Sequence, residues 1–316
     1  MKVLFWGTPE FAAPPLRALL GEGFEVIGVV TQPDRPQGRS RSRFVPSPIK
    51  QIAVEESITV LQPEKPRGPE FVEELRALEP DISIVVAYGH ILPRDVIELP
   101  RLGTLNIHAS LLPQWRGAAP IQAAIRAGQT ETGVTIMRMV TRLDAGPILL
   151  QIPTPIVHDE TYGELQLRLS ELGALALIEA LSLLDIGQIS ERPQDDGLAT
   201  FAPKVEREDA RIDWTLPASD IACAIRAFDP KPGAFSTLRG AEVKLFGARP
   251  WPHATGVDVE SSGPGVVVAV DESGAIVSTG NGVIRIIDAQ PSGKRRLSIA
   301  ELARGRGITV GDRLGA

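Results

Sequence analysis

Short apolar runs alternate with segments of helical periodicity through residues 1–140, and this alternation restricts the fold more than any other feature. The first apolar run, at 2–7, is followed by a helical segment at 10–20. The same alternation predicts strands at 25–31, 82–87, 103–108 and 133–139, and helices at 48–56, 69–78 and 119–127. Strands that alternate with helices form a parallel sheet covered by helices. We therefore expect a doubly wound α/β domain, whose ligands bind beyond the carboxyl ends of its strands.

The pattern changes in the second half of the chain. A long helix is predicted over 162–184 because its leucines recur at helical spacing, and a polar stretch follows it. Beyond that stretch the sequence predicts a short helix at 218–228 and short strands at 234–238, 243–248, 265–270, 275–279 and 283–288. Such strands suit a small OB-like β-barrel and equally a β-sandwich. We expect a first domain at 1–186, a linker at 187–210 and a second domain at 211–316.

Composition limits the class of protein. The 316 residues suffice for two domains, and 43% of them are hydrophobic, which is enough for ordinary cores. The single cysteine, Cys223, excludes a disulfide within the chain. No apolar run approaches the roughly 20 residues of a membrane span, and the chain does not start like a secretory signal. We expect a cytoplasmic protein with no membrane partner, and nothing in the sequence requires more than a monomer.

Asn106 and His108 lie two residues apart at the end of the strand predicted at 103–108. Because side chains alternate along a strand, these two are expected to share one pocket wall while Ile107 points into the core. An amide donor beside an imidazole suits chemistry at a carbonyl group, and Asp144 adds a carboxylate in a tight loop. Taken alone, an Asn-x-His pair is more often structural, and an Asp before Ala-Gly is usually a turn residue.

A longer set of motifs changes that balance, because together they resemble the folate-dependent formyltransferases. In chain order they are F-W-G-T-P-E-F-A, T-Q-P-D-R-P-x-G-R, P-S-P-I-K, V-A-Y-G-H-I-L-P, N-I-H-A-S-L-L-P-Q-W-R-G, L-D-A-G-P-I-L, E-D-A-R-I-D-W and I-R-A-F-D-P. They lie in this order within residues 3–230, and they are most similar to the branch of the family that acts on methionyl-tRNA. The resemblance favours the OB-like barrel over the sandwich and implies that this second domain binds tRNA.

The resemblance also implies the reaction. A formyl group would pass from 10-formyltetrahydrofolate to the α-amino group of initiator methionyl-tRNA, by direct attack and without a metal. In that reaction Asn106 can donate to the oxyanion, and His108 can accept or relay the proton that the amine loses. Asp144 can stabilise the protonated form of His108 or position a water molecule. The sequence spacing of the four histidines and one cysteine suggests no metal site.

By the same resemblance the folate is expected to contact Ile91, Leu92, Ser110, Leu111, Leu112, Pro113 and Asp144. Ile91 and Leu92 could equally be core residues. Ser110 lacks the G-x-S-x-G setting of a nucleophilic serine and is expected to brace its turn. The turn Gly7-Thr8-Pro9 would shape the pocket for the aminoacyl group, or it is a plain strand-to-helix turn.

The chain has a net charge of −6, yet two of its segments are basic. Residues 33–50 contain five basic residues and one acidic residue, and residues 291–313 contain six basic and two acidic residues. Such segments suit contacts with phosphates, although solvated basic loops have the same composition. The candidates for tRNA binding are Arg35, Arg39, Arg41, Arg43 and Lys50, with Arg39 favoured by the resemblance. The sequence departs from common relatives at S-R-S-R-F, where they carry two lysines, and at Lys231, where many carry tryptophan.

Other functions fit the same three side chains. A formyltransferase for a small amine, such as glycinamide ribonucleotide or an amino sugar nucleotide, would also use Asn106, His108 and Asp144. The arginine-rich loop and the basic C-terminal segment favour the tRNA substrate instead. A non-catalytic RNA-binding protein and a hydrolase of the formyl donor are two further alternatives.

Overall fold

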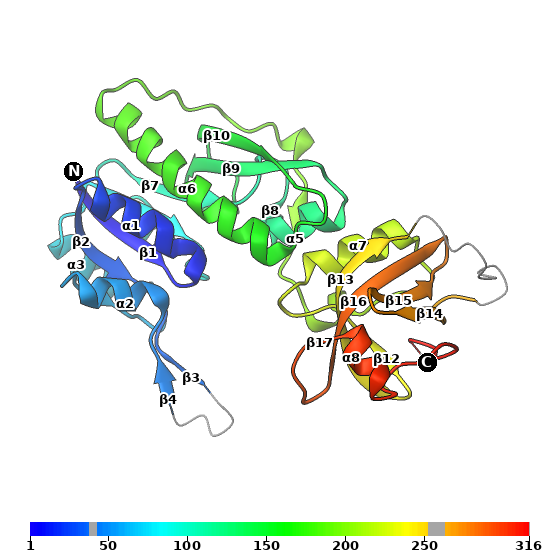
Figure 1. The fold of residues 1–316 in the computed structure, drawn as a ribbon. Helices are drawn as coiled ribbons and strands as arrows, with labels where there is room; N and C mark the ends of the chain where they lie inside the picture. The colour runs from blue at the N-terminus through cyan, green and yellow to red at the C-terminus, as the bar shows by residue number, and fades with distance from the viewer. Residues whose placement is uncertain (38–42, 252–262, 316) are drawn as a thin grey trace. The chain divides into compact units, whose positions relative to one another are not determined.

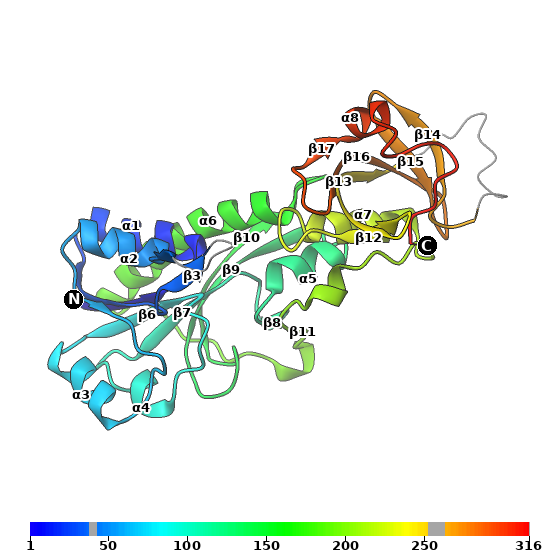
Figure 2. The same cartoon turned by 90° about the horizontal axis from the view of Figure 1, so that it is seen from below.

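The computed structural model describes residues 1–37, 43–251 and 263–315, which form two compact units (Figures 1 and 2). The first unit contains residues 1–120, 132–154 and 166–202. The second unit contains the rest, including 121–131 and 155–165. Both units are therefore discontinuous in the chain, and the boundaries 1–186 and 211–316 remain a proposal from the sequence.

The first unit is built on a seven-stranded sheet. Its order is β10 (Ile148–Pro155), β9 (Glu131–Arg138), β7 (Thr104–His108), β6 (Ile82–Val86), β1 (Lys2–Gly7), β2 (Glu25–Val30) and β5 (Val60–Leu61). The five strands from β7 to β5 are parallel, which confirms the parallel sheet predicted from the alternation. Strands β1 and β6 are apolar along almost their whole length because both faces of the sheet are covered.

Strand β9 runs antiparallel to β7, which the simple alternation did not predict. The helix before it, α5 (Pro120–Arg126), falls almost entirely in the second unit. There the Arg126 guanidinium lies 5.3 Å from the centre of the Phe228 ring. A parallel connection needs a helix that packs back onto the sheet, whereas most of α5 belongs to the second unit.

Helices cover both faces of the sheet (Figure 2). The helices α1 (Ala13–Gly21), α2 (Pro48–Glu55) and α6 (Tyr162–Asp185) lie on one face, and α3 (Pro69–Ala77) and α4 (Arg94–Ile97) lie on the other. Leu4 and Trp6 of β1 share an apolar cluster with Phe71 and Leu75 of α3. Among the described residues, no helix is long and apolar enough to cross a bilayer.

Helix α6 fixes which face of β7 is available for chemistry. A Cβ atom at Gly173 of α6 would lie 3.0 Å from Ile107 Cγ2, so the helix approaches the strand closely at a residue without a side chain. Ile107 therefore points toward α6, and it is 3% exposed. Because successive side chains alternate, Asn106 and His108 lie on the opposite face, away from the helix.

The second unit is an antiparallel sheet. Its order is β12 (Phe235–Leu238), β13 (Ala241–Pro250), β16 (Val283–Pro291), β15 (Gly274–Ser278) and β14 (Val267–Asp271). Strand β17 (Leu297–Ser298) pairs with β16, and the helices α7 (Ala218–Ala227) and α8 (Ile299–Arg304) pack with the sheet. Alternate strand residues, with Ile221 and Ile225 of α7, fill one apolar core.

Residues 311–315 close this sheet into a barrel. The Leu314 amide donates to Gly265 O at 2.8 Å, beside the edge strand β14. The Gly315 amide donates to Thr237 O of the other edge strand, β12, at 2.9 Å. One segment thus supplies hydrogen bonds to both edges, which leaves neither as a free template for pairing. The turn-separated strands alone left a barrel and a sandwich open, and this closed antiparallel sheet agrees with the barrel that the family resemblance favoured.

Several short elements gave no usable sequence signal. They are the hairpin of β3 (Arg35–Gln37) and β4 (Arg43–Val45), the paired strands β8 (Arg116–Gly117) and β11 (Phe201–Ala202), and the single-turn helices η2 (Asp196–Leu198) and η3 (Arg207–Ala210). The single-turn helix η1 (Glu10–Ala12), by contrast, falls within the helix predicted at 10–20. Strands of two or three residues are too short to show a period of two. The pair β8–β11 matters most, because it ties the polar stretch after α6 to the first unit.

The barrel closure predicts different effects for two aliphatic residues near the end of the described chain. Leu314 is 2% exposed within the barrel core, whereas Val310 is 63% exposed. We expect Leu314→Ala to lower the free energy of unfolding of the second unit by about 2–5 kcal/mol, because a buried side chain is removed. Val310→Ala should change it by less than about 0.5 kcal/mol. Amide hydrogen exchange of β12 and β14 measures both, and equal exchange in the two variants would contradict the closure.

Candidate active site

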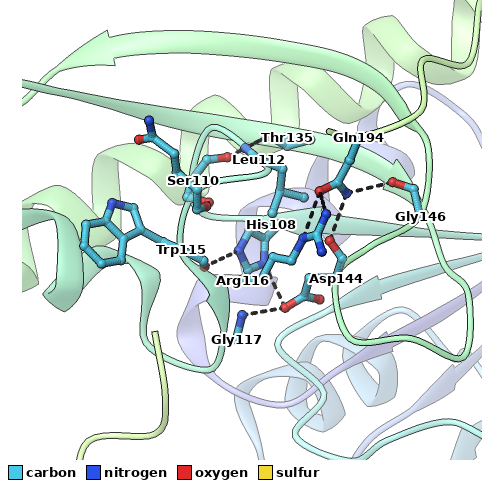
Figure 3. A network of polar contacts seen from close by, with 11 residues as sticks. His108, Ser110, Leu112, Trp115, Arg116, Gly117, Thr135, Asp144, Gly146 and Gln194 are labelled. Atoms are coloured by element: carbon cyan, nitrogen blue, oxygen red, sulfur yellow. Dashed lines mark hydrogen bonds and ion pairs between the residues drawn. The ribbon is translucent and has the colours of Figure 1, made fainter. Parts of the chain in front are cut away.

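The candidate site lies at the carboxyl end of β7, where separate stretches of the first unit meet (Figure 3). Strand β7 supplies Asn106 and His108, and the loop at 109–117 follows it directly. The loop at 139–147, between β9 and β10, supplies Asp144. Residues 187–202, here called the strap, run beside both loops and pair with the first through β8 and β11.

His108 is held by two neighbours on opposite sides of its ring. Its Nε2 lies 3.0 Å from the backbone oxygen of Trp115, and its Nδ1 lies 3.8 Å from Asp144 Oδ2. A carbonyl oxygen only accepts, so the contact with Trp115 assigns a proton to Nε2. The neutral ring then presents an unprotonated Nδ1 toward the carboxylate. His108 is 5% exposed, so this arrangement is shielded from bulk water.

Asp144 adopts a backbone conformation that its surroundings must enforce. Its φ angle of 46° lies in the left-handed region, which costs a residue with a side chain about 1 kcal/mol or more. The Gly117 amide donates to Asp144 Oδ2 at 2.7 Å and so orients the carboxylate. Two residues on, a Cβ atom at Gly146 would overlap the Arg138 carbonyl, so the loop is pressed against β9 at a position that only glycine fits.

The strap holds this loop from its other side through Gln194. The Gln194 Nε2 donates to the backbone oxygens of Asp144, at 2.9 Å, and of Gly146, at 2.7 Å. Its Oε1 accepts from Arg116, whose Nε and Nη2 lie 3.0 and 2.8 Å away. Arg116 is 4% exposed, and its Nη2 also lies 2.9 Å from Asp196 Oδ1. The buried guanidinium is thus paired with a carboxylate of the same strap.

Asp196 joins the strap to both loops. Besides Arg116, it binds Arg142 of the Asp144 loop, whose Nη2 lies 2.6 Å from Asp196 Oδ1. Hydrogen bonds from Arg142 and Arg116 lower the pKa of the Asp196 carboxyl below its ordinary value. The strap also accepts hydrogen bonds from the first loop, because the Trp115 amide donates to Thr200 Oγ1 at 2.9 Å.

The turn after His108 is braced by hydroxyl groups. The Ser110 hydroxyl donates to Gln114 O at 2.6 Å, so its proton is already engaged within the turn. The Thr135 hydroxyl donates to Ser110 O at 2.6 Å and accepts from the Leu112 amide at 3.1 Å. Gln151 Nε2 donates to Leu112 O at 2.9 Å. Strands β9 and β10 therefore fix the turn that carries the expected folate contacts.

The remaining expected folate contacts differ in exposure. Ile91 is 86% exposed, whereas Leu92 is buried with Trp6 and Tyr88 in the apolar cluster between the sheet and helices α3 and α4. Leu112 is also buried, and Leu111 and Pro113 are partly exposed. Asn106 is partly exposed in the centre of the sheet, between Val85 and Met137. Among the described side chains, no three His, Cys, Asp or Glu gather as metal ligands would.

The turn Gly7-Thr8-Pro9 joins the carboxyl ends of three neighbouring strands. The Thr8 hydroxyl donates to Tyr88 O at 3.2 Å and accepts from the Gln32 amide at 3.3 Å. Gln32 Nε2 also donates to Tyr88 O, at 2.9 Å. These contacts bring the ends of β1, β2 and β6 together at the edge of the sheet where β7 also ends.

The first basic segment, residues 33–50, begins after β2 at this same edge of the sheet. Arg39 and Arg41 lie outside the described residues, and Arg43 lies in β4. The Arg35 guanidinium donates to Gln32 Oε1. Lys50 Nζ lies 2.7 Å from Asp34 Oδ2, and this contact is the main cause of the lowered pKa of Asp34. Lys50 therefore anchors the base of the hairpin.

Sequence reasoning did not identify Gln194, Arg116 or Thr135 as parts of this site. Arg116 falls within the motif W-R-G, which could have marked it for attention. Gln194 falls in a polar stretch with no periodicity, and its contacts are with backbone atoms 48 and 50 residues away. No pattern in one sequence reports such contacts.

Comparisons with known proteins identify the family of this chain. Residues 1–181 match the family model "Formyl transferase", and residues 204–307 match "Formyl transferase, C-terminal domain". A methionyl-tRNA formyltransferase of Aromatoleum aromaticum is 48% identical, over 100% of this chain and 98% of the relative. One of Stutzerimonas stutzeri is 46% identical, over 97% and 95%.

Solved structures share the fold at lower identity. HypX from Aquifex aeolicus has a TM-score of 0.67 and 22% identity, over 98% of this chain and 48% of that one. An N-formyltransferase from Helicobacter canadensis has a TM-score of 0.67 and 18% identity, over 92% and 99%. These likenesses support the fold, and the family assignment rests on the full-length relatives. The chain belongs to the formyl transferase family, and within it to the methionyl-tRNA formyltransferases.

Proposed function

We propose that this chain transfers the formyl group of 10-formyltetrahydrofolate to the α-amino group of initiator methionyl-tRNA, in the cytoplasm and as part of translation initiation. The observation that carries the proposal is identity of 46–48% with methionyl-tRNA formyltransferases over nearly the whole of both chains. The side chains at the end of β7 supply the chemistry that such a transfer needs.

Asn106 supports the attack on the formyl carbon. The amine nitrogen adds to that carbon, and negative charge develops on the formyl oxygen. The Asn106 side chain, on the face of β7 opposite α6, can donate an N–H to this oxygen. Such a donor, fixed before the reaction begins, typically contributes a factor of about 10²–10³ in rate. The strand holds Asn106 between two neighbours, so little reorganisation is needed.

His108 and Asp144 support the proton transfers. An α-amino group has a pKa of about 8, so the ammonium form must first lose one proton to solvent, and the attacking amine gives a second proton to His108 as the bond forms. His108 Nδ1 is the free acceptor, because Nε2 is engaged by Trp115. Asp144, 3.8 Å away, stabilises the imidazolium that results. The proton then passes to the folate nitrogen as its bond to the formyl carbon breaks, which leaves tetrahydrofolate and formylmethionyl-tRNA.

No covalent intermediate on the enzyme is needed for this sequence. The Ser110 hydroxyl, the nearest candidate nucleophile in the motif, donates its proton to Gln114 O. It has no histidine partner among its described hydrogen bonds. The formyl group therefore passes directly from donor to acceptor.

The basic segment supports an RNA substrate over a small amine. Glycinamide ribonucleotide or an amino sugar nucleotide would use the same Asn106, His108 and Asp144. Neither would need the basic hairpin of β3 and β4, which projects from the body of the first unit (Figure 1). We propose that Arg35, Arg39, Arg41 and Arg43 contact phosphates of the tRNA.

Formyl transfer from donor labelled in the formyl carbon tests the proposal. Separate reactions contain initiator methionyl-tRNA, elongator methionyl-tRNA, glycinamide ribonucleotide or no acceptor. We expect label in the initiator aminoacyl ester. Label only in glycinamide ribonucleotide would show that the acceptor is this small amine and not tRNA. Loss of donor without a labelled product would indicate hydrolysis.

The proposed role of Asn106 predicts a loss of turnover without a loss of binding. In Asn106→Ala, kcat should fall by about 10²–10³, because one oxyanion donor is removed. The dissociation constant for the folate, measured by fluorescence titration, should change by less than about threefold. A fall in kcat of less than tenfold, in a variant that unfolds at the wild-type temperature, would remove Asn106 from the mechanism.

The proposed role of the basic segment predicts a loss that depends on salt. In Arg39→Ala, kcat/KM for methionyl-tRNA should fall by about tenfold, and its logarithmic salt slope should become shallower by about 1. Arg17→Ala, an exposed arginine of α1, is the matched control and should behave as wild type. Equal salt slopes for Arg39→Ala and wild type would contradict the phosphate contact.

A further inference from the structure

Gln194 uses the whole hydrogen-bonding capacity of its amide at the candidate site (Figure 3). Both N–H groups of Nε2 reach backbone oxygens, those of Asp144 and Gly146. Its Oε1 accepts both hydrogen bonds from Arg116. A neutral amide with two donors and two accepting lone pairs has no capacity left. Such complete use fixes the side chain in a single orientation.

Arg116 determines which way the Gln194 amide points. The oxygen and nitrogen of an amide are similar in shape, so either could face a given partner. A guanidinium only donates, and therefore Oε1 must face Arg116. The Nε2 must then face the two carbonyls. Arg116 is itself fixed, because it is buried and paired with Asp196.

The two carbonyls that Gln194 binds belong to the strained part of the Asp144 loop. Asp144 has a positive φ, and Gly146 packs against Arg138 without space for a side chain. A residue with a side chain leaves the left-handed region when nothing holds it there. Without the two donors of Gln194 the loop is free to relax, which rotates the Asp144 carboxylate away from His108.

The backbone at 115–117 contacts both ionisable groups of the site, His108 and Asp144. Trp115 O binds His108, and the Gly117 amide binds the Asp144 carboxylate. Between them, the Arg116 side chain holds Gln194, which holds the backbone of Asp144. The carboxylate is therefore fixed at both ends, at its oxygen by Gly117 and at its backbone by Gln194.

From these contacts we infer that Gln194 is a positioning residue for formyl transfer, which keeps the Asp144 carboxylate within reach of His108. The inference rests on the proposed function, and it extends the site to a residue between the two family-model matches, which end at residue 181 and resume at 204. Gln194 touches no reacting atom. It acts through Asp144, and Arg116 orients it.

The test compares two substitutions with a matched control. Gln194→Glu keeps an acceptor for Arg116 but removes both donors to the loop, and Gln194→Met removes donors and acceptor without adding charge. The control, Gln188→Glu, makes the same glutamine-to-glutamate substitution at an exposed position of the strap. We expect kcat to fall by about ten- to a hundredfold in both Gln194 variants, because a misplacement of about 1 Å has an effect of this size. The KM for each substrate should stay within about threefold, and Gln188→Glu should match wild type.

A second measurement separates positioning from general destabilisation. If Gln194 acts through Asp144, Gln194→Met should have less than about a threefold further effect on kcat in an Asp144→Asn background. Multiplying effects in the double variant would overturn the inference, as would wild-type kcat in both single variants of Gln194.

A crystal structure of Gln194→Met adds a readout that does not depend on activity. The inference predicts that the separation of His108 Nδ1 and Asp144 Oδ2 increases from its 3.8 Å. An unchanged separation would overturn it. If wild-type enzyme transferred no formyl group while this separation still widened, the proposed function would fail and the structural role of Gln194 would stand.

Discussion

The backbone at Trp115–Gly117 holds the two ionisable groups on which the candidate site depends. One of its oxygens binds His108 and one of its amides binds the Asp144 carboxylate, so a single short stretch places an imidazole from β7 beside a carboxylate from a distant loop. A backbone anchor has few ways to move when its own strand is paired. Strand β8 provides that pairing with β11, and the Thr135 hydroxyl fixes the turn before it. The pair is therefore assembled before substrates arrive, which is the condition for efficient electrostatic catalysis.

The two faces of β7 carry different kinds of side chain, apolar on the face toward α6 and polar on the face of the candidate site. On one side Ile107 packs beneath α6, and the glycine at position 173 lets the helix come close. On the other side Asn106 and His108 face the site. The parallel order of the strands brings the ends of β1, β2 and β6 to the same edge, so the basic hairpin after β2 begins at the edge where the candidate site lies. Because side chains alternate along β7, the core residue and the candidate site residues lie on opposite faces of the strand.

Much of the fold could be predicted from the sequence, because long regular elements carry a periodic pattern of apolar residues. Long apolar runs such as β1 and β6, and the leucine-rich α6, carry a clear period and were placed within a few residues. The shared face of Asn106 and His108 also follows from alternation. The antiparallel direction of β9 and the contacts of Gln194 depend on chain segments that meet only in the folded state. The pairing of Lys50 with Asp34 was missed for the same reason, since charge counts give composition and not partners.

A rapid-quench experiment tests whether the formyl group passes directly between the two substrates at preassembled side chains. Enzyme carrying donor labelled in the formyl carbon is mixed with excess initiator methionyl-tRNA, and label is counted on donor, protein and acceptor during one turnover. With direct transfer, we expect label to leave the donor and enter the acceptor with one rate constant, while the protein stays unlabelled. Label that appears on the protein before it appears on the acceptor would show a covalent intermediate and rule out direct transfer.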